Sequence, residues 1–181
     1  MGKVYDAIDD GLRSFIEAQH VFFAASAPAA GGHVNLSPKG LDSLRIIDGR
    51  TLLYLDYVGS GAETIAHLND DGRIVLMLCA FDGAPKIVRL HGRGEAIEPQ
   101  HEQYAELRGL FPSDLPARAV IRVSVERISD SCGFGVPLME FKAERATLTD
   151  YWDQNGEQKV DDYQRKENAK SLDGLPGVSK T

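Results

Sequence analysis

The chain has 181 residues, of which 43% are hydrophobic, and these values indicate one globular domain with a sizeable core. Its formal net charge of −7 lacks the basic surplus typical of proteins that bind nucleic acid, so we expect no nucleic-acid partner. No apolar run is long enough to span a bilayer, and residues 1–10 lack the layout of a secretion signal, so the sequence predicts a cytoplasmic protein without a membrane partner.

The first predicted element is an amphipathic helix over residues 7–20, because four apolar side chains share one helical face. They are Ile8, Leu12, Phe15 and Ile16. The apolar run over residues 21–25 then predicts a buried strand, and residues 33–37 predict the returning strand, which we expect to stop at Pro38.

A first hairpin is expected next, because Asp48-Gly49 separates strand-like runs over residues 44–47 and 51–57. Residues 62–69 predict a short helix after it.

A second hairpin is predicted from apolar runs over residues 74–81 and 86–97, which flank Asp82-Gly83. Helices are expected over residues 99–110 and, from weak charge pairing, about 161–170. Between these helices, residues 119–128 alternate as in a half-buried strand, with Ile121, Val123 and Val125 on one face.

These elements amount to six or seven strands in hairpins with few helices, which favours an antiparallel barrel or sandwich over a doubly wound sheet. We expect residues 1–150 to form the barrel domain with its leading helix. Residues 151–181 are expected to add a helix and a tail that pack on the same domain.

The turn Gly59-Ser60-Gly61 is the first candidate for a ligand site. It joins a strand to a helix whose free N–H groups favour an anion, and Ser60 and Thr64 add hydroxyl donors for a phosphate. The same residues also fit a capping box, in which Ser60 caps the helix and Glu63 reaches back, and a capping box needs no ligand.

The strand before Pro38 is the second candidate, because it presents Asn35 and Ser37 on one side and then offers Lys39 from a turn. A lysine there is suited to neutralise a phosphate or an electron-rich ring edge. The alternative is a plain strand end with a solvated lysine.

Other reactive side chains give weaker signals. Arg89, His91 and Arg93 share one strand face, which suits an anion or a subunit contact but is more often the solvent side of a sheet. Cys79 is expected in the core, and Cys132 has no neighbouring histidine that would make it a nucleophile. The histidines show no metal-ligand spacing, so no metal site is predicted.

Taken together, three segments resemble the pyridoxamine 5'-phosphate oxidase-like family of FMN-binding split barrels. The segments are Gly32-His-Val-Asn-Leu-Ser-Pro-Lys-Gly40, the strand, turn and helix over residues 52–68, and the hairpin over residues 73–94. The order of elements matches as well, and the resemblance covers about residues 10–130. From Cys132 onward the chain resembles a subgroup with a Cys-Gly-aromatic-Gly-Val-Pro stretch and an Asp-Gly-Leu-Pro-Gly tail.

The resemblance implies a mainly β fold with flanking helices, built as an antiparallel six-stranded split β-barrel. It further implies a homodimer that binds FMN in clefts between its subunits. On this sequence the residues expected to bind FMN are Asn35, Ser37, Lys39, Ser60, Gly61, Thr64 and Arg89.

Three polar anchors of the family's oxidases are replaced in this chain. Val34 stands where an arginine holds the FMN phosphate, Gly61 and Ala62 replace two basic residues, and Ile87 stands at a glutamine near the flavin ring. A phosphate held by N–H groups and hydroxyls alone is bound less tightly than one held by arginine. The pyridoxamine-phosphate oxidase reaction itself is therefore not expected.

The leading hypothesis is an FMN-binding flavoprotein that acts as an oxidoreductase on an unknown substrate. The alternatives are a non-catalytic module for flavin, deazaflavin or haem, and a dimeric structural protein with an empty cleft. No catalytic acid or base can be identified from the sequence, and the substrate, the electron donor, the role of Cys132 and that of the tail stay open.

Overall fold

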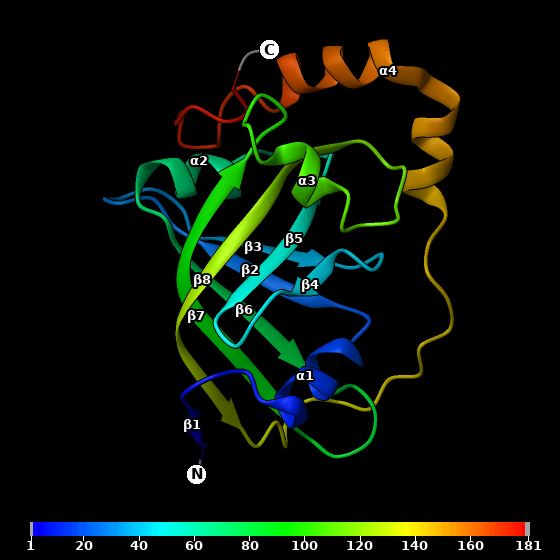
Figure 1. Ribbon diagram of the computed structural model, residues 1–181. Coiled ribbons are helices and arrows are strands. Elements are labelled where there is room, and N and C mark those ends of the chain that lie inside the picture. Colours follow the sequence, from blue (N-terminus) through cyan, green and yellow to red (C-terminus); the bar gives the residue numbers. More distant parts are fainter. Residues whose placement is uncertain (1, 180–181) are drawn as a thin grey trace.

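The protein is a curled antiparallel sheet with helices around it, seen in a computed structural model that describes residues 2–179 (Figure 1). The sheet runs in the order β3-β2-β6-β7-β8-β5-β4, and β1 pairs with β8. The strands are β1 (Val4–Tyr5), β2 (Phe22–Ser26), β3 (Asn35–Lys39), β4 (Leu44–Ile46), β5 (Thr51–Tyr57), β6 (Arg73–Cys79), β7 (Ile87–Ile97) and β8 (Ala117–Ser131). The helices are α1 (Asp10–Glu17), α2 (Glu63–Asp70), α3 (Tyr104–Arg108) and α4 (Thr147–Glu167).

The mainly β, antiparallel class expected from the sequence is confirmed. Both hairpins form as predicted, β4 with β5 around Asp48-Gly49 and β6 with β7 around Asp82-Gly83. The alternation on β8 is confirmed too, because Ile121, Val123 and Val125 are buried. The two-residue strand β1 was not expected from the sequence.

The prediction that the third strand stops at Pro38 is wrong, because β3 continues through Pro38 to Lys39. Among the described residues, β3 pairs only with β2 and forms an edge of the sheet. A proline lacks the N–H donor, and an edge strand tolerates this because one side of the strand has no ladder to form. The extra residues place Lys39 on the strand itself.

The core lies inside the curled sheet and is closed at one end by α1. The α1 side chains Leu12 and Ile16 are each 1% exposed, and Asp9 caps the helix by accepting a hydrogen bond from the Leu12 N–H. A second, smaller cluster lies between β5, β8 and Phe111, next to α3. Cys79 is buried and free, as the sequence predicted.

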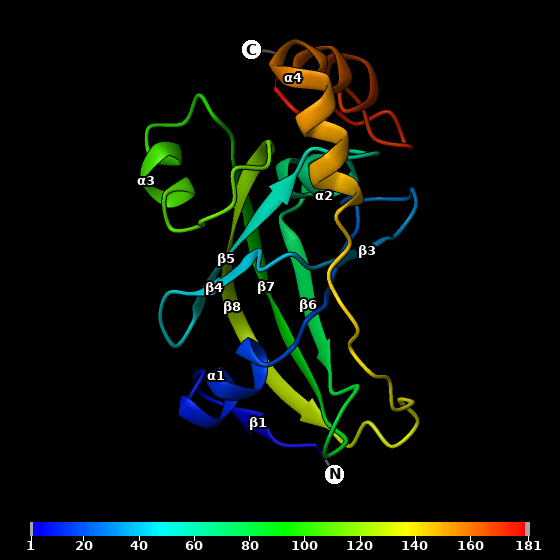
Figure 2. The same cartoon turned by 90° about the vertical axis from the view of Figure 1, so that its right-hand side faces the viewer.

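The chain beyond β8 turns back along the outside of the sheet. Figure 2 shows the segment after β8 running the length of the molecule to α4, which lies at the opposite end from the N-terminus. The helix expected at about 161–170 begins much earlier, at Thr147, and Gly156 interrupts it with a φ of 70°. Only Trp152 of α4 is buried, so the periodicity that would reveal the helix is weak.

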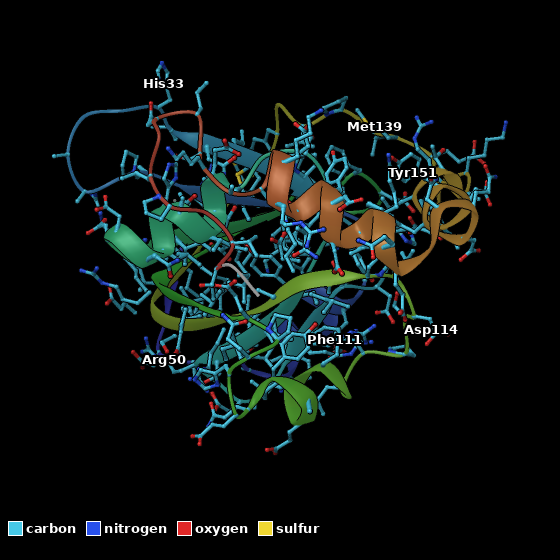
Figure 3. All side chains as sticks on the ribbon, turned by 90° about the horizontal axis from the view of Figure 1, so that it is seen from above. His33, Arg50, Phe111, Asp114, Met139 and Tyr151 are labelled. Atoms are coloured by element: carbon cyan, nitrogen blue, oxygen red, sulfur yellow. The ribbon has the colours of Figure 1, made fainter. Side chains whose placement is uncertain are left out.

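The C-terminal tail returns from α4 to α2. Seen from above, the tail loop passes beside His33 (Figure 3), whose imidazole Nδ1 lies 2.7 Å from the Asp173 carboxylate. Gly177 fits closely against α2, because a Cβ there would lie 2.7 Å from the Ala62 Cβ. Within residues 2–179, no helix is both long and apolar enough to cross a membrane.

The bulge between His91 and Gly92 on β7 allows a test of the register between β7 and β8. A Cβ on Gly92 would lie 2.1 Å from the Ser124 carbonyl oxygen, so Gly92→Ala forces the β7–β8 backbones apart. We expect a loss of about 2 kcal/mol or more in the free energy of unfolding, measured by urea denaturation. Gly135→Ala is the control, because no atom of residues 2–179 lies within 4 Å of a Cβ there. Equal stability of the two variants would contradict the strand register.

Candidate functional site

A buried carboxylate lies at the centre of the candidate site. Asp56, near the end of β5, is 0% exposed, and its Oδ1 accepts a hydrogen bond from Lys39 Nζ at 2.7 Å. Its Oδ2 lies 3.0 Å from Arg118 Nη2 on β8. Burial alone would raise the pKa of Asp56, but Lys39 and Arg118 together hold it below the usual value. Two cations around one carboxylate leave the trio with a net positive charge.

The turn at residues 59–61 is held from inside the protein by two side chains. Asn168 Nδ2 donates to the carbonyl oxygens of Gly59 and Gly61 at 2.9 and 3.0 Å, and Arg118 donates to the same two oxygens. In a trans peptide the N–H points opposite to the C=O, so the N–H groups of Ser60 and Ala62 point away from these side chains. Within residues 2–179 neither N–H has a hydrogen-bond partner. The turn therefore presents donors outward.

The capping-box alternative is wrong. Helix α2 begins at Glu63 with Ala62 as N-cap, and no side chain caps it. Gly61 has a φ of 75°, and this left-handed residue separates Ser60 from the helix start. Glu63 Oε1 instead accepts a hydrogen bond from the Leu172 N–H at 3.0 Å. The Ser60 side chain is thus left exposed, without a bond to the helix.

Asn35 and Thr64, both predicted site residues, meet in a polar network between β3 and α2. Asn35 Nδ2 donates to Thr64 Oγ1 at 3.0 Å and to Ser26 Oγ at 3.2 Å. Ser26 Oγ lies 3.0 Å from Nδ1 of His67, which is 0% exposed. Because these groups bind one another, they position β3 against α2, and their role towards a ligand stays a prediction.

The remaining predicted residues divide between two places. Ser37 lies between Asn35 and Lys39 and faces the same, partly buried side of β3. Arg89 lies on β7, where it donates to Ser131 Oγ at 3.0 Å. Two strands separate β7 from β3, and Arg89 does not line the pocket that holds Lys39 and Ser60.

A pocket of about 780 Å³ brings Lys39 and Ser60 together. Its first wall is the end of β3 with the loop after it, and the segment Val58–Ser60. Its second wall comes from residues 138–168, which we call the C-terminal arm. The arm residues that line the pocket are Phe141, Ala143, Glu144, Arg145, Thr147, Leu148, Tyr151, Trp152 and Tyr163.

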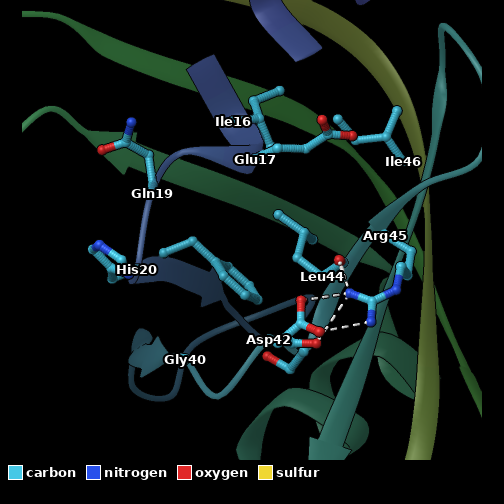
Figure 4. Close-up of a pocket in the computed structure, with 11 residues that line it drawn as sticks. Ile16, Glu17, Gln19, His20, Gly40, Asp42, Leu44, Arg45 and Ile46 are labelled. Carbon is cyan, nitrogen blue, oxygen red and sulfur yellow. Dashed lines mark hydrogen bonds and ion pairs between the residues drawn. The ribbon is translucent and has the colours of Figure 1, made fainter. Parts of the chain in front are cut away.

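A smaller pocket of about 310 Å³ lies between α1 and β4 (Figure 4). Its main polar groups are already bound to one another, because the Arg45 guanidinium donates to both Asp42 carboxylate oxygens, at 2.8 and 2.9 Å, and to the Leu44 carbonyl. This pocket therefore offers a ligand fewer free polar groups than the pocket beside Ser60.

Sequence reasoning missed Asp56, Arg118, Asn168 and the arm. Asp56 did carry a signal, because it is a charged residue inside the apolar run of a buried strand, where a charge needs a partner. Nothing in the sequence indicated that the partners are Lys39 and Arg118. Asn168 had no signal, since its bond to Gly59 joins residues 109 positions apart.

Comparison with known proteins gives a consistent result. Residues 8–132 match the family described as Pyridoxamine 5'-phosphate oxidase. The chain is 38% identical over 194 aligned positions to the pyridoxamine 5'-phosphate oxidase family protein ustO of Aspergillus flavus, covering 96% of this chain and 77% of that protein.

Two solved structures resemble the fold. A variant of HupZ from Group A Streptococcus has a TM-score of 0.57 at 22% identity, covering 68% of this chain and 99% of that chain. An FAD-binding protein of Mesorhizobium loti has a TM-score of 0.50 at 14% identity, covering 72% of this chain and 95% of that one.

The Asp56 trio makes a prediction about stability. Removing the carboxylate leaves two cations facing one another, so we expect Asp56→Ala to lower the free energy of unfolding by about 3–5 kcal/mol. Asp161→Ala, at an exposed position of α4, is the control and should change stability by less than about 0.5 kcal/mol. Urea denaturation at pH 7 measures both, and a loss below about 1 kcal/mol in Asp56→Ala would contradict the ion pairs.

The same trio predicts a pH dependence. A carboxyl whose folded pKa is lowered stabilises the protein above its unfolded pKa of about 3.9, and that stability is lost as the pH falls through the folded pKa. The difference in unfolding free energy between the native chain and Asp56→Asn should therefore shrink as the pH falls below about 4. Denaturation at pH 7 and pH 3 tests this, and a constant difference would refute it.

Proposed function

This chain belongs to the pyridoxamine 5'-phosphate oxidase family, and we propose that it binds a flavin, specifically FMN, as a flavin-dependent oxidoreductase. The observation that carries the proposal is the turn at residues 59–61, which directs the N–H groups of Ser60 and Ala62 outward beside the net positive trio of Asp56. Such donors suit a phosphate. The description of the Mesorhizobium loti protein as FAD-binding agrees with a flavin on this fold.

The residues present fit a flavin phosphate without an arginine clamp. The Ser60 hydroxyl is exposed beside the outward N–H groups, and Lys39 lines the same pocket, with its side chain 16% exposed. Because Lys39 Nζ donates to Asp56, Lys39 would act on a phosphate mainly through electrostatic attraction. The pocket volume of about 780 Å³ lies within the usual range for cofactor sites.

A bound flavin would supply the redox chemistry. The residues of this chain would bind the phosphate, orient the ring and exclude water with the apolar wall of the pocket. Because Lys39 and Arg118 are both committed to Asp56, a second candidate function is a non-catalytic flavin-binding module. Oxidation of a reduced nicotinamide by the flavin-loaded protein distinguishes the enzyme from the module.

We propose further that the chain forms a homodimer through the outer face of β3, β2 and β6. Leu36 lies opposite Ala25, which lies opposite Val75, so apolar side chains line up across this face. Leu36 is 63% exposed and the adjacent Val34 is 76% exposed. An exposed apolar row on a sheet is typical of a surface that another protein covers.

Ser60→Ala tests the phosphate site, because the Ser60 side chain makes no hydrogen bond within residues 2–179 whose loss would disturb the fold. A hydrogen bond to a charged group contributes about 1.5–3 kcal/mol, so we expect FMN to bind about 10- to 100-fold more weakly. Affinity is measured by titration against FMN, with Ser124→Ala, an exposed serine on β8, as the control. Unchanged affinity in Ser60→Ala would refute the assignment of Ser60 to the phosphate site. If the native chain does not bind FMN, the proposed function is refuted.

Leu36→Glu tests the dimer. A glutamate on the exposed side of β3 costs the monomer little, but it would bury a charge at the proposed interface. Sedimentation should show a dimer for the native chain and a monomer for this variant. Leu172→Glu, at a position that is 72% exposed on the tail, should remain dimeric. A monomeric native chain would refute the proposal.

A further inference from the structure

The C-terminal arm brings a cluster of aromatic rings to the pocket beside Ser60. The Tyr151 and Trp152 rings meet edge to face, with centroids 4.8 Å apart, and Trp152 meets Tyr163 in the same way at 5.6 Å. Tyr151 is 41% exposed, so part of its ring is open to solvent, and it lines the pocket. These rings form an aromatic wall opposite Lys39 and Ser60.

The aromatic wall is fixed to the barrel. Trp152 is 5% exposed, and its indole Nε1–H donates to the Val58 carbonyl oxygen at 3.2 Å, directly before the turn. At the other side of the pocket, Phe141 of the arm stacks on His20 with ring centroids 3.6 Å apart and planes 9° from parallel. The pocket therefore already contains one stacked pair of rings, formed by two residues of the chain that line it.

Hydrogen-bond donors and charge divide the pocket into two ends. The Ser60 end offers the outward N–H groups of the turn and the Ser60 hydroxyl, and it lies beside the net positive Asp56 trio and the Glu63 carboxylate next to Gly61. The aromatic end carries one acidic and one basic lining residue, Glu144 and Arg145, whose charges balance. The pocket is therefore complementary to a molecule with an anionic group at one end and an uncharged ring at the other.

We propose that the aromatic wall binds a planar, uncharged aromatic ring, and that Tyr151 is its stacking surface. The ring belongs either to the flavin or to an aromatic substrate that stacks beside it. This deepens the proposed function, and it rests on that function only in placing a ligand phosphate at Ser60. Offset-stacked and edge-to-face aromatic contacts each contribute beyond simple burial of apolar area, which favours an aromatic ring over an aliphatic group of equal size.

The test uses the full chain with four probes: FMN, riboflavin, 2-naphthol and, as a non-aromatic control, cyclohexanol. Equilibrium dialysis gives the affinities. Trp152 is the only tryptophan, so its indole N–H gives one identifiable peak in a ¹⁵N–¹H NMR spectrum that reports binding at the wall. We expect 2-naphthol and riboflavin to move this peak and cyclohexanol to leave it unmoved.

Tyr151→Ala should weaken 2-naphthol and riboflavin about three- to tenfold, the range of a single aromatic contact. Tyr151→Phe keeps the ring and should bind like the native chain. Leu110→Ala, which removes another partly exposed apolar side chain on a different surface, is the control. An unmoved indole peak, or equal affinity in Tyr151→Ala and the native chain, would overturn the proposal.

The probes also distinguish a flavin ring from an aromatic substrate as the occupant of the wall. They distinguish the failure of the aromatic site from the failure of the proposed flavin function as well. Displacement of FMN by 2-naphthol identifies the flavin ring as the occupant, whereas 2-naphthol binding to the FMN-loaded protein identifies an aromatic substrate. FMN binding that depends on Ser60 and not on Tyr151, together with no binding of 2-naphthol, would refute the aromatic site and leave the flavin proposal intact. Binding of 2-naphthol that depends on Tyr151, without any FMN binding, would refute the flavin proposal and support the aromatic site.

Discussion

The site depends on the burial of one carboxylate. Asp56 is fully buried, and an ionised group in that position is tolerated only with charged partners. Lys39 meets it from β3 and Arg118 from β8. Strand pairing alone does not join β3 to β5, because four strands stand between them in the order of the sheet. The ion pair with Lys39 therefore connects parts of the sheet that backbone hydrogen bonds leave apart.

Arg118 connects the buried Asp56 carboxylate to the turn at residues 59–61. The same guanidinium that neutralises Asp56 donates to the carbonyl oxygens of Gly59 and Gly61. Lys39 and Arg118 are both paired with Asp56, so the direct hydrogen-bond donors that the turn offers to a ligand are backbone N–H groups and the Ser60 hydroxyl. Donors held in a fixed direction need no rearrangement when an anion binds. The saving in free energy offsets part of the binding free energy that a direct arginine contact would contribute.

The sequence revealed what is local and missed what is distant. Asp48-Gly49 predicts its hairpin because turn type and strand alternation are set by neighbouring residues. Lys39 was recognised as a site residue, but its partner Asp56 lies 17 positions away on another strand and only the curl of the sheet brings them together. Pro38 was misjudged because the sequence does not tell an edge strand from a central one. Similarly, Gly156 and the exposed surface of α4 concealed the start of that helix.

The C-terminal arm ties the two ends of the candidate site into one unit. Trp152 donates to the Val58 carbonyl just before the turn, and Asn168 holds the turn itself, while the aromatic residues between them face the pocket. The arm lies outside residues 8–132, the part that matches the family, but the alignment with the Aspergillus protein spans 96% of this chain and so includes it. Any ligand that touches both the turn and the aromatic wall stabilises the contact between arm and barrel, and a firmer contact in turn raises the affinity for that ligand. The arm is thus part of the candidate site, because Trp152 and Asn168 hold the turn and the residue before it in place.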